Sequence, residues 1–344
     1  MTEPTALTLV TGGSGFLAGH TIAQLLAAGH RVRTTARSAA REAEVRDTLT
    51  RAGADTTELS FVAADLTEDT GWAEAVAGAS HVLHMASPFP PQQPDDPDDL
   101  IVPAREGTLR VLRAATAGGV RRVVLTSSFA AVGYSPRPAG WVYDESDWTD
   151  PSDDNDPYVL SKTLAERAAW DFVAATPGAP ELTVINPVGV FGPVLGPKLS
   201  SSVGIIAMLL SGRPAPLPRA SFAVVDVRDV ADLHLRAMTS PVAAGQRYLA
   251  SAGAAVTLPE IAATLRSRLG ERAAQVPELV IDDDEFRAVA ATRPELAIFA
   301  GLLGEPKQVS HAKATEMLGW QPRSAADAVT ATAQSLLELS GSTR

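Results

Sequence analysis

The 344-residue chain contains no cysteine, which excludes disulfide bonds and any chemistry in which a thiolate acts as a nucleophile or metal ligand. It also lacks a long apolar run, because the longest beyond the N-terminal region, residues 203–210, is too short to cross a bilayer. A basic segment followed by an apolar signal core is missing from the start of the sequence as well. From these absences we expect a cytoplasmic protein with no membrane partner.

Positive charge is also scarce. The chain has 29 Lys and Arg residues against 40 Asp and Glu residues, which gives a formal net charge of −11. Such a surface repels the phosphate backbone of nucleic acids and anionic lipids, so we expect neither as a partner. The composition, 45% hydrophobic and 20% charged, is that of a globular protein with room for one large core or two unequal domains.

A glycine-rich turn, TGGSGFLA at residues 11–18, follows an apolar run at 6–10 that predicts a strand. Helical spacing of apolar residues over 16–28 predicts a helix directly after the turn. Gly12 permits a tight turn, and Gly15 lets the backbone approach a pyrophosphate without a Cβ in the way. The helix would direct free N–H groups and its positive dipole end at that anion. The spacing is Gly-x-x-Gly-x-x-Ala, and a turn without a ligand is the alternative interpretation.

Short apolar runs alternate with amphipathic helical patterns from residue 6 to about 190. This alternation predicts an α/β fold, a Rossmann-type doubly wound parallel sheet whose ligands bind beyond the carboxyl ends of the strands. The predicted strands cover 6–10, 31–35, 59–63, 81–85, 122–126 and 182–186. The predicted helices cover 16–28, 41–52, 72–77, 100–117 and 157–174.

The pattern becomes less regular after residue 191, where proline is frequent. Further strands are predicted at 222–227 and 247–250, and further helices at 258–269 and 324–339. We expect residues 1–187 and about 223–250 to form the dinucleotide-binding Rossmann domain. The rest, about 188–222 and 251–344, would form a smaller C-terminal α/β substrate-binding domain. The Pro- and Asp-rich stretch 88–99 predicts a loop that is neither helix nor central strand.

The end of the second predicted strand indicates which nicotinamide cofactor would fit. An NAD-selective site usually places Asp or Glu about 20 residues beyond the glycines, to accept from the ribose 2′-hydroxyl. Arg37 stands there instead, with Arg33 nearby, and arginine suits a 2′-phosphate. The sequence therefore predicts NADP(H), unless both arginines are solvated surface charges. Asp65 and Leu66, after the third strand, are placed to accept from the adenine amino group, although a solvated loop aspartate is the alternative.

Tyr158 and Lys162 lie four residues apart in PYVLSK, so a helix would place both side chains on one face. A phenol has an ordinary pKa of about 10, and a nearby ammonium lowers the pKa by favouring the phenolate. The pair could then donate a proton to a carbonyl oxygen. Ser127 and Ser128 follow the fifth strand, where a hydroxyl can hold that oxygen. Each pattern alone also fits an ordinary surface pair or turn, but the combination in this order is specific.

These motifs resemble the extended short-chain dehydrogenases/reductases, and the resemblance covers almost the whole chain. It is carried by TGGSGFLA at 11–18, Ser127-Ser128, YVLSK at 158–162, INPVGVFGP at 185–193, FAVVDVRDVADLHLRAM at 222–238 and LGWQPRS at 318–324. The branch resembled most contains carbonyl reductases like dihydroflavonol reductase and methylglyoxal (aldehyde) reductase. Its members imply that Tyr158 is the acid/base, that Lys162 holds the nicotinamide ribose and lowers the tyrosine pKa, and that Ser128, rather than Ser127, orients the carbonyl.

The resemblance also implies which residues would bind the cofactor and the substrate. The expected cofactor-binding residues are Thr11, Gly12, Ser14, Gly15, Phe16, Leu17, Arg37, Asp65, Leu66, Ala86, Ser87, Ser127, Tyr158, Lys162, Pro187 and Val190. The expected substrate-binding residues are Pro88, Phe89, Ser128, Phe129, Tyr158, Val188 and Phe191. No metal site is expected, because His81 and His84 would point to opposite faces of a strand.

Three functions remain open on this sequence. We expect reversible NADPH-dependent reduction of a hydrophobic or aromatic aldehyde or ketone, because apolar and aromatic residues would surround the nicotinamide. A nucleotide-sugar epimerase or dehydratase is the first alternative. A dehydratase usually has an acidic residue right after the catalytic serine, and residues 129–133 contain none. A non-catalytic NADP(H) sensor is the second, although sensors tend to lack the tyrosine or the lysine. We expect a monomer or a homodimer.

Overall fold

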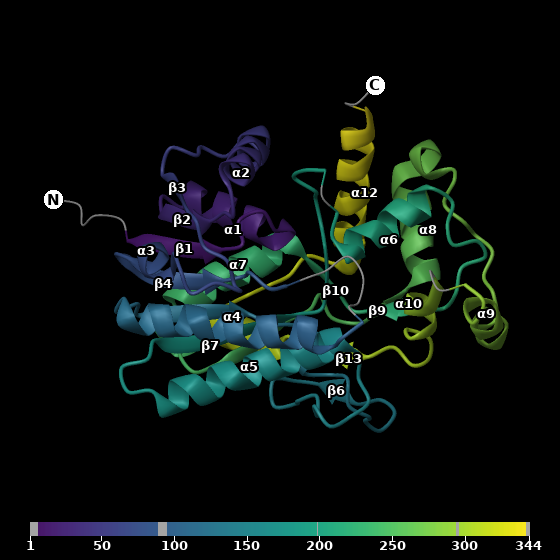
Figure 1. Ribbon diagram of the computed structural model, residues 1–344. Coiled ribbons are helices and arrows are strands. Elements are labelled where there is room, and N and C mark those ends of the chain that lie inside the picture. Colours follow the sequence, from purple (N-terminus) through teal and green to yellow (C-terminus); the bar gives the residue numbers. More distant parts are fainter. Residues whose placement is uncertain (1–5, 89–94, 198, 294–295, 342–344) are drawn as a thin grey trace.

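A seven-stranded parallel sheet forms the centre of the computed structural model, which describes residues 6–88, 95–197, 199–293 and 296–341 (Figure 1). Its strands are β1 (Leu7–Thr11), β2 (Arg31–Thr35), β3 (Leu59–Val62), β4 (Ala79–His84), β5 (Arg122–Thr126), β7 (Glu181–Pro187) and β11 (Arg247–Ala250). The strand order is β11-β7-β5-β4-β1-β2-β3. The chain therefore runs outward from β1 in one direction and then in the other, which confirms the predicted doubly wound Rossmann-type sheet.

Alternate side chains of the strands bury themselves under different helices, as parallel strands covered on both faces require. Val10 and Ile185 belong to one core cluster, and Leu9 and Val184 to another. Helices α1 (Phe16–Ala27), α2 (Ala39–Arg51) and α7 (Val227–Thr239) supply the first cluster. Helices α3 (Trp72–Val76), α4 (Asp98–Ala117) and α5 (Pro157–Ala175) supply the second (Figure 1).

The C-terminal region forms a third core cluster beside the sheet (Figure 1). Its helices are α6 (Ser201–Leu210), α8 (Leu258–Leu269), α9 (Asp283–Ala290), α10 (Ala297–Ala300) and α12 (Ala325–Gly341). Helix α11 (Ala312–Leu318) and Trp320 instead pack in the first cluster, although we assigned them to the substrate-binding domain. The division into two domains stays a prediction. No helix within the described ranges is long and apolar enough to span a membrane.

Small elements connect these parts. Three two-stranded sheets join β10 (Val224–Asp226) to β8 (Gly189–Phe191), β12 (Val256–Thr257) to β9 (Ser221–Phe222), and β13 (Gln308–Val309) to β6 (Val142–Tyr143). The short helical turns are η1 (Phe129–Ala131), η2 (Pro241–Ala243) and η3 (Gly270–Ala273).

Two stretches differ from the sequence prediction. Helix α4 begins at Asp98, inside the stretch that we predicted as a loop, because Pro97 takes the N-cap and two aspartates follow in the first turn. Acidic residues there are favoured by the helix dipole. The single strand expected at 222–227 is broken into β9 and β10, and α7 begins at Val227 because the Asp226 carboxylate accepts a hydrogen bond from Arg228 N.

Candidate active site

The predicted site residues gather at the carboxyl ends of four neighbouring strands. The glycine turn follows β1, Ala86 and Ser87 follow β4, Ser127 and Ser128 follow β5, and Pro187 ends β7. These strands are adjacent in the order β7-β5-β4-β1. Parallel strands end at the same edge of a sheet, so four segments far apart in sequence are brought to one place.

The glycine turn has the shape of an anion cradle. Gly12 has φ +74°, and a Cβ there would lie 3.0 Å from the Ala86 Cα, so a side chain meets both strain and contact. Gly15 N donates to Gly12 O at 2.9 Å and sets Gly15 as the N-cap of α1. Ser14 and Gly15 are exposed, and no acidic residue stands in the first turn of α1. A pyrophosphate would therefore meet an exposed backbone turn at the positive end of a helix, which fits a dinucleotide.

Thr11 has a different place from the one we predicted. Its side chain is fully buried, and its hydroxyl oxygen accepts from the backbone N–H groups of Met85 and Ala86 at 3.0 Å each. The hydroxyl also pairs with Nδ1 of His84 at 2.8 Å. Thr11 thus joins β1 to the segment after β4 and fixes Ala86 beside the glycine turn. Phe16 and Leu17 are half-buried and pack on the cores at the start of α1.

Arg37 and Arg33 do different things. Arg37 lies beyond β2 with 74% of its side chain exposed, and its Nη1 is 3.7 Å from Oδ2 of Asp65. Arg33 Nη1 instead donates to the carbonyl oxygens of Glu74, Ala75 and Ala77 at 2.8–3.0 Å and so satisfies the end of α3. The expectation that both arginines meet a 2′-phosphate is therefore wrong for Arg33.

Asp65 and Leu66 lie after β3, beside Arg37. Oδ1 of Asp65 accepts from the N–H and the hydroxyl of Thr67, and these hydrogen bonds hold the pKa of the carboxyl below its usual value. The group is thus a carboxylate with Oδ2 facing Arg37. The Leu66 carbonyl accepts from Arg110 at 2.8 Å.

Tyr158 and Ser128 meet across the site. Pro157 and the Asp156 cap, whose carboxylate accepts from Val159 N at 3.0 Å, begin α5 directly before Tyr158. The Tyr158 hydroxyl donates to Ser128 Oγ at 3.4 Å. Ser128 caps η1 by accepting from Ala130 N at 3.1 Å. Of the two serines, Ser128 faces the tyrosine, whereas the Ser127 hydroxyl donates to Glu166 Oε2 at 2.6 Å.

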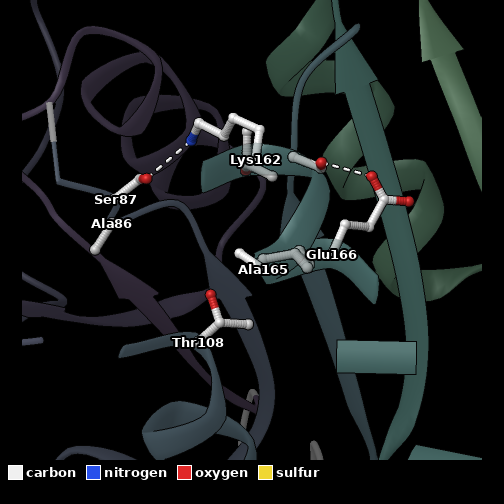
Figure 2. A pocket seen from close by; sticks show the side chains of 9 residues that line it. Ala86, Ser87, Thr108, Lys162, Ala165 and Glu166 are labelled. Atoms are coloured by element: carbon white, nitrogen blue, oxygen red, sulfur yellow. Dashed lines mark hydrogen bonds between the residues drawn. The ribbon is translucent and has the colours of Figure 1, made fainter. Parts of the chain in front are cut away.

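Lys162 lies one turn after Tyr158 on the same helix face. Its Nζ donates to the Ser87 hydroxyl at 2.9 Å, as Figure 2 shows, and lies 5.7 Å from the centre of the Tyr158 ring. Burial lowers the pKa of Lys162 to about 8. Burial also raises the pKa of Tyr158, an effect that its hydrogen bond to Ser128 opposes. The pKa of Tyr158 is therefore raised in this structure, with burial as the largest cause, and the lowering expected from Lys162 is not found.

A small pocket lies beside Ser87 and Lys162, between the ends of β4 and β5 and helices α4 and α5. It is lined by Ala86, Ser87, Thr108, Leu125, Thr126, Ser127, Lys162, Ala165 and Glu166 (Figure 2). The lining joins Lys162 on one side to the buried carboxylate of Glu166 on the other.

Three polar residues of this region are absent from the sequence prediction: Glu166, Asn186 and Arg247. Glu166 is fully buried and forms an ion pair with Arg247 at 2.6 Å, and Asn186 Nδ2 donates to Glu166 Oε2 at 2.7 Å. A signal for Glu166 was present, since 158, 162 and 166 continue one spacing of four along a helix face. Arg247 lies 81 residues further on in another predicted strand, and no local pattern joins it to Glu166.

The predicted substrate residues divide into partly exposed and buried groups. Pro88 is half-buried at the edge of the site, and Phe89 lies outside the described residues. Phe191 has no exposed surface and packs in the third core, so its expected contact with substrate is wrong. Phe129 (7% exposed) and Val188 (9%) are buried in the first core cluster, Phe129 directly after Ser128 and Val188 directly after β7. Pro187 is buried and Val190 half-buried, and the Val190 carbonyl accepts from Ser202 at 2.5 Å.

Comparison with known proteins gives consistent similarities. The sequence model of the NAD dependent epimerase/dehydratase family matches residues 8–250. A cinnamoyl-CoA reductase of Medicago truncatula is 36% identical over 315 residues, or 90% of this chain and 94% of that protein. A ketoreductase of Aspergillus niger is 35% identical over 297 residues, or 80% and 86%. The structure of yeast methylglyoxal/isovaleraldehyde reductase complexed with NADPH has a TM-score of 0.80 and 28% identity, over 97% of this chain and 99% of that one.

Proposed function

The chain belongs to the NAD dependent epimerase/dehydratase family, the extended short-chain dehydrogenases/reductases predicted from its motifs, and we propose that it reduces an aldehyde or ketone to the alcohol with NADPH. The observation that carries the proposal is the meeting of Tyr158, Ser128 and Lys162 beside the glycine turn. The relatives named above are a cinnamoyl-CoA reductase, a ketoreductase and a methylglyoxal/isovaleraldehyde reductase, and they support an oxidoreductase.

The residues present fit the cofactor. The turn at Gly12 and Gly15 would hold the pyrophosphate, and Arg37 would reach the 2′-phosphate that distinguishes NADPH from NADH. Lys162 would hold the nicotinamide ribose, with Ser87 fixing the ammonium. The NADPH complex of the yeast relative supports the same cofactor for this chain.

The chemistry is divided between cofactor and protein. The reduced nicotinamide, when bound, supplies a hydride to the carbonyl carbon. The Ser128 hydroxyl holds the carbonyl oxygen by hydrogen bonding, and the Tyr158 hydroxyl donates a proton to the same oxygen. The Lys162 ammonium lies on the same helix face and favours the phenolate that remains. Alcohol oxidation uses the same groups in reverse.

The segment after Ser128 supports a reductase over a dehydratase. Residues Phe129–Ala131 form the buried turn η1 and carry no carboxylate beside the serine. Together with Val188 they make the segments after β5 and β7 apolar, which favours a hydrophobic or aromatic carbonyl compound. The cytoplasmic location and the monomeric or homodimeric state stay predictions.

The test is NADPH oxidation in the presence of aromatic and aliphatic aldehydes, ketones and diketones, repeated with NADH. We expect turnover with apolar carbonyl compounds and a preference for NADPH. Turnover with a preference for NADH would contradict the role of Arg37 and leave the chemistry standing. Tight NADPH binding without turnover of any carbonyl compound would contradict the reductase function.

A further inference from the structure

Glu166 extends the row of Tyr158 and Lys162 by one more turn of α5. It lines the same small pocket as Lys162 (Figure 2). Its side chain is fully buried and both carboxylate oxygens are occupied. Oε2 accepts from the Ser127 hydroxyl at 2.6 Å and from Asn186 Nδ2 at 2.7 Å. Oε1 accepts from Arg247 Nε at 2.6 Å and from Trp170 Nε1 at 3.3 Å. One buried group thus joins α5, the end of β5, β7 and β11.

Two of these contacts lead to the serine that faces Tyr158. Ser127 is the chain neighbour of Ser128, and its backbone N–H also donates to the Ile185 carbonyl at 2.8 Å. The Asn186 Nδ2 that reaches Glu166 donates to the Ser128 carbonyl as well, at 3.1 Å. The backbone of Ser128 is therefore fixed from both sides by partners of one carboxylate.

On its other side the Glu166 carboxylate pairs with the positive charge of Arg247, which a buried carboxylate requires. Arg247 is 7% exposed, and its Nη1 donates to the carbonyl oxygens of Glu145 and Asp147 at 2.8 and 2.9 Å. Its guanidinium lies 3.7 Å from the ring centre of Trp148. A buried carboxylate without such a partner would be strongly destabilising.

All four partners of Glu166 are donors toward it: a hydroxyl, an amide N–H, a guanidinium N–H and an indole N–H. Only a group that accepts at both ends satisfies all of them, and an ionised carboxylate is that group. A glutamine of the same shape would turn an NH₂ toward one pair of donors and push that pair away. The arrangement thus depends on the carboxylate itself, beyond its size.

We propose that Glu166 is a positioning residue, which holds Ser128 at the correct place against Tyr158 through Ser127 and Asn186. This inference rests on the proposed reductase function. The hydrogen bond from Tyr158 to Ser128 is already long, at 3.4 Å, so a shift of the serine backbone would break it. Displacements of about 1 Å at a reacting group can cost about 100-fold in rate.

A double-mutant cycle tests the proposal. We expect Glu166→Gln to lower kcat by about 10- to 100-fold while leaving the NADPH dissociation constant within about twofold, because the glycine turn does not contact Glu166. In the Ser128→Ala background the same change should lower kcat by less than about twofold, since the residue through which it acts is gone. An equal fold-loss of kcat in both backgrounds would mean a merely structural role and overturn the proposal.

A milder pair keeps the test valid where Glu166→Gln does not fold. Ser127→Ala removes one hydrogen bond from the serine side of the carboxylate, and Trp170→Phe removes one from the opposite side. We expect Ser127→Ala to lower kcat several-fold and Trp170→Phe to leave it unchanged. Equal effects of the two variants would contradict the proposal. Absence of turnover in the wild-type protein would instead contradict the reductase function, so the two failures are distinguishable.

Discussion

The two walls of the candidate site are built in opposite ways. The wall after β1 consists of backbone: Gly12, an exposed N-cap glycine and the first turn of α1. The wall after β5 and β7 consists of side chains: Ser128 is fixed by Asn186 and a buried carboxylate. The first depends on the absence of side chains along one short segment. The second depends on charges and hydrogen bonds that distant segments contribute.

This difference decides what a substitution does on each wall. At the glycine turn, an added Cβ is harmful whatever its chemistry, because it enters the space of the backbone and the ligand. At the serine wall, shape is less important than which atoms donate and which accept. The first wall should therefore fail in cofactor binding, and the second in the rate of the chemical step.

The largest effect is expected at Tyr158, whose hydroxyl faces Ser128 on the serine wall. Tyr158→Phe removes the proton donor and should reduce kcat by about 10³-fold or more, because general acid catalysis contributes up to about 10⁴. The NADPH dissociation constant, measured by fluorescence titration, should stay close to that of the wild type. Retained turnover would reject the assignment of Tyr158 as the acid.

The matching change on the backbone wall is Gly12→Ala. It adds strain at φ +74° and a contact with Ala86, so we expect NADPH binding about 10- to 100-fold weaker. Gly29→Ala is the control: Gly29 has φ +81°, but nothing lies within 4 Å of the added Cβ. That variant should lower the melting temperature without changing NADPH affinity. Equal loss of affinity in both would show that strain alone, rather than the cradle, is responsible.

Arg37→Ala sharpens the comparison at the adenosine end. Loss of a charged partner of the 2′-phosphate should raise KM for NADPH by about 10-fold or more, since a hydrogen bond to a charged group contributes at least about 1.5 kcal/mol. KM for NADH should change little. Arg51, which pairs with Asp47 at the end of α2, supplies a control variant, Arg51→Ala, with no expected effect on either. A parallel rise of both KM values would contradict the 2′-phosphate contact.

The smallest effect concerns pH. Because burial lowers the pKa of Lys162 to about 8, its charge is present below pH 8 and lost above it. We expect kcat/KM for reduction to fall about tenfold between pH 7 and pH 9, as kcat/KM reports groups of the free enzyme. In the unfolded chain the Lys162 ammonium keeps its proton up to about pH 10.5. Between pH 8 and that value the unfolded chain binds more protons at this residue than the folded protein does, so the Lys162 contribution to the free energy of unfolding rises with pH. A flat profile to pH 10 would contradict the role of Lys162.

The glycine-turn wall after β1 could be predicted from the sequence, but only part of the serine wall could. The glycine turn, its flanking strand and helix, and the Tyr158–Lys162 spacing are local patterns, and the structure has the turn and the helix face where the patterns indicate. Arg33 was misassigned because its partners, the carbonyl oxygens that end α3, lie more than 40 residues away. Phe191 was misassigned because the residues next to it in the sequence do not show that it packs into the third core cluster, which the C-terminal helices form.

The partners of Glu166 show why the rest could not be predicted. A buried carboxylate is improbable on composition alone, and its partner Arg247 is on a strand at the far edge of the sheet. Nothing in the residues around 247 indicates that β11 pairs with β7 and brings the guanidinium to α5. Long-range ion pairs depend on the completed topology, and local patterns do not contain it.

The position of Arg247 in the chain has a consequence for synthesis on the ribosome. β1, the glycine turn and α1 all lie within the first 27 residues, and the strands β2–β5 follow before residue 127. Arg247 on strand β11, which forms the ion pair with Glu166, is translated 81 residues after that glutamate. A nascent chain can therefore form the strands β1–β5 early, whereas Glu166 acquires its charged partner only once β11 has left the exit tunnel. The proposed positioning of Ser128 by Glu166 would then be completed after the glycine turn at each round of translation.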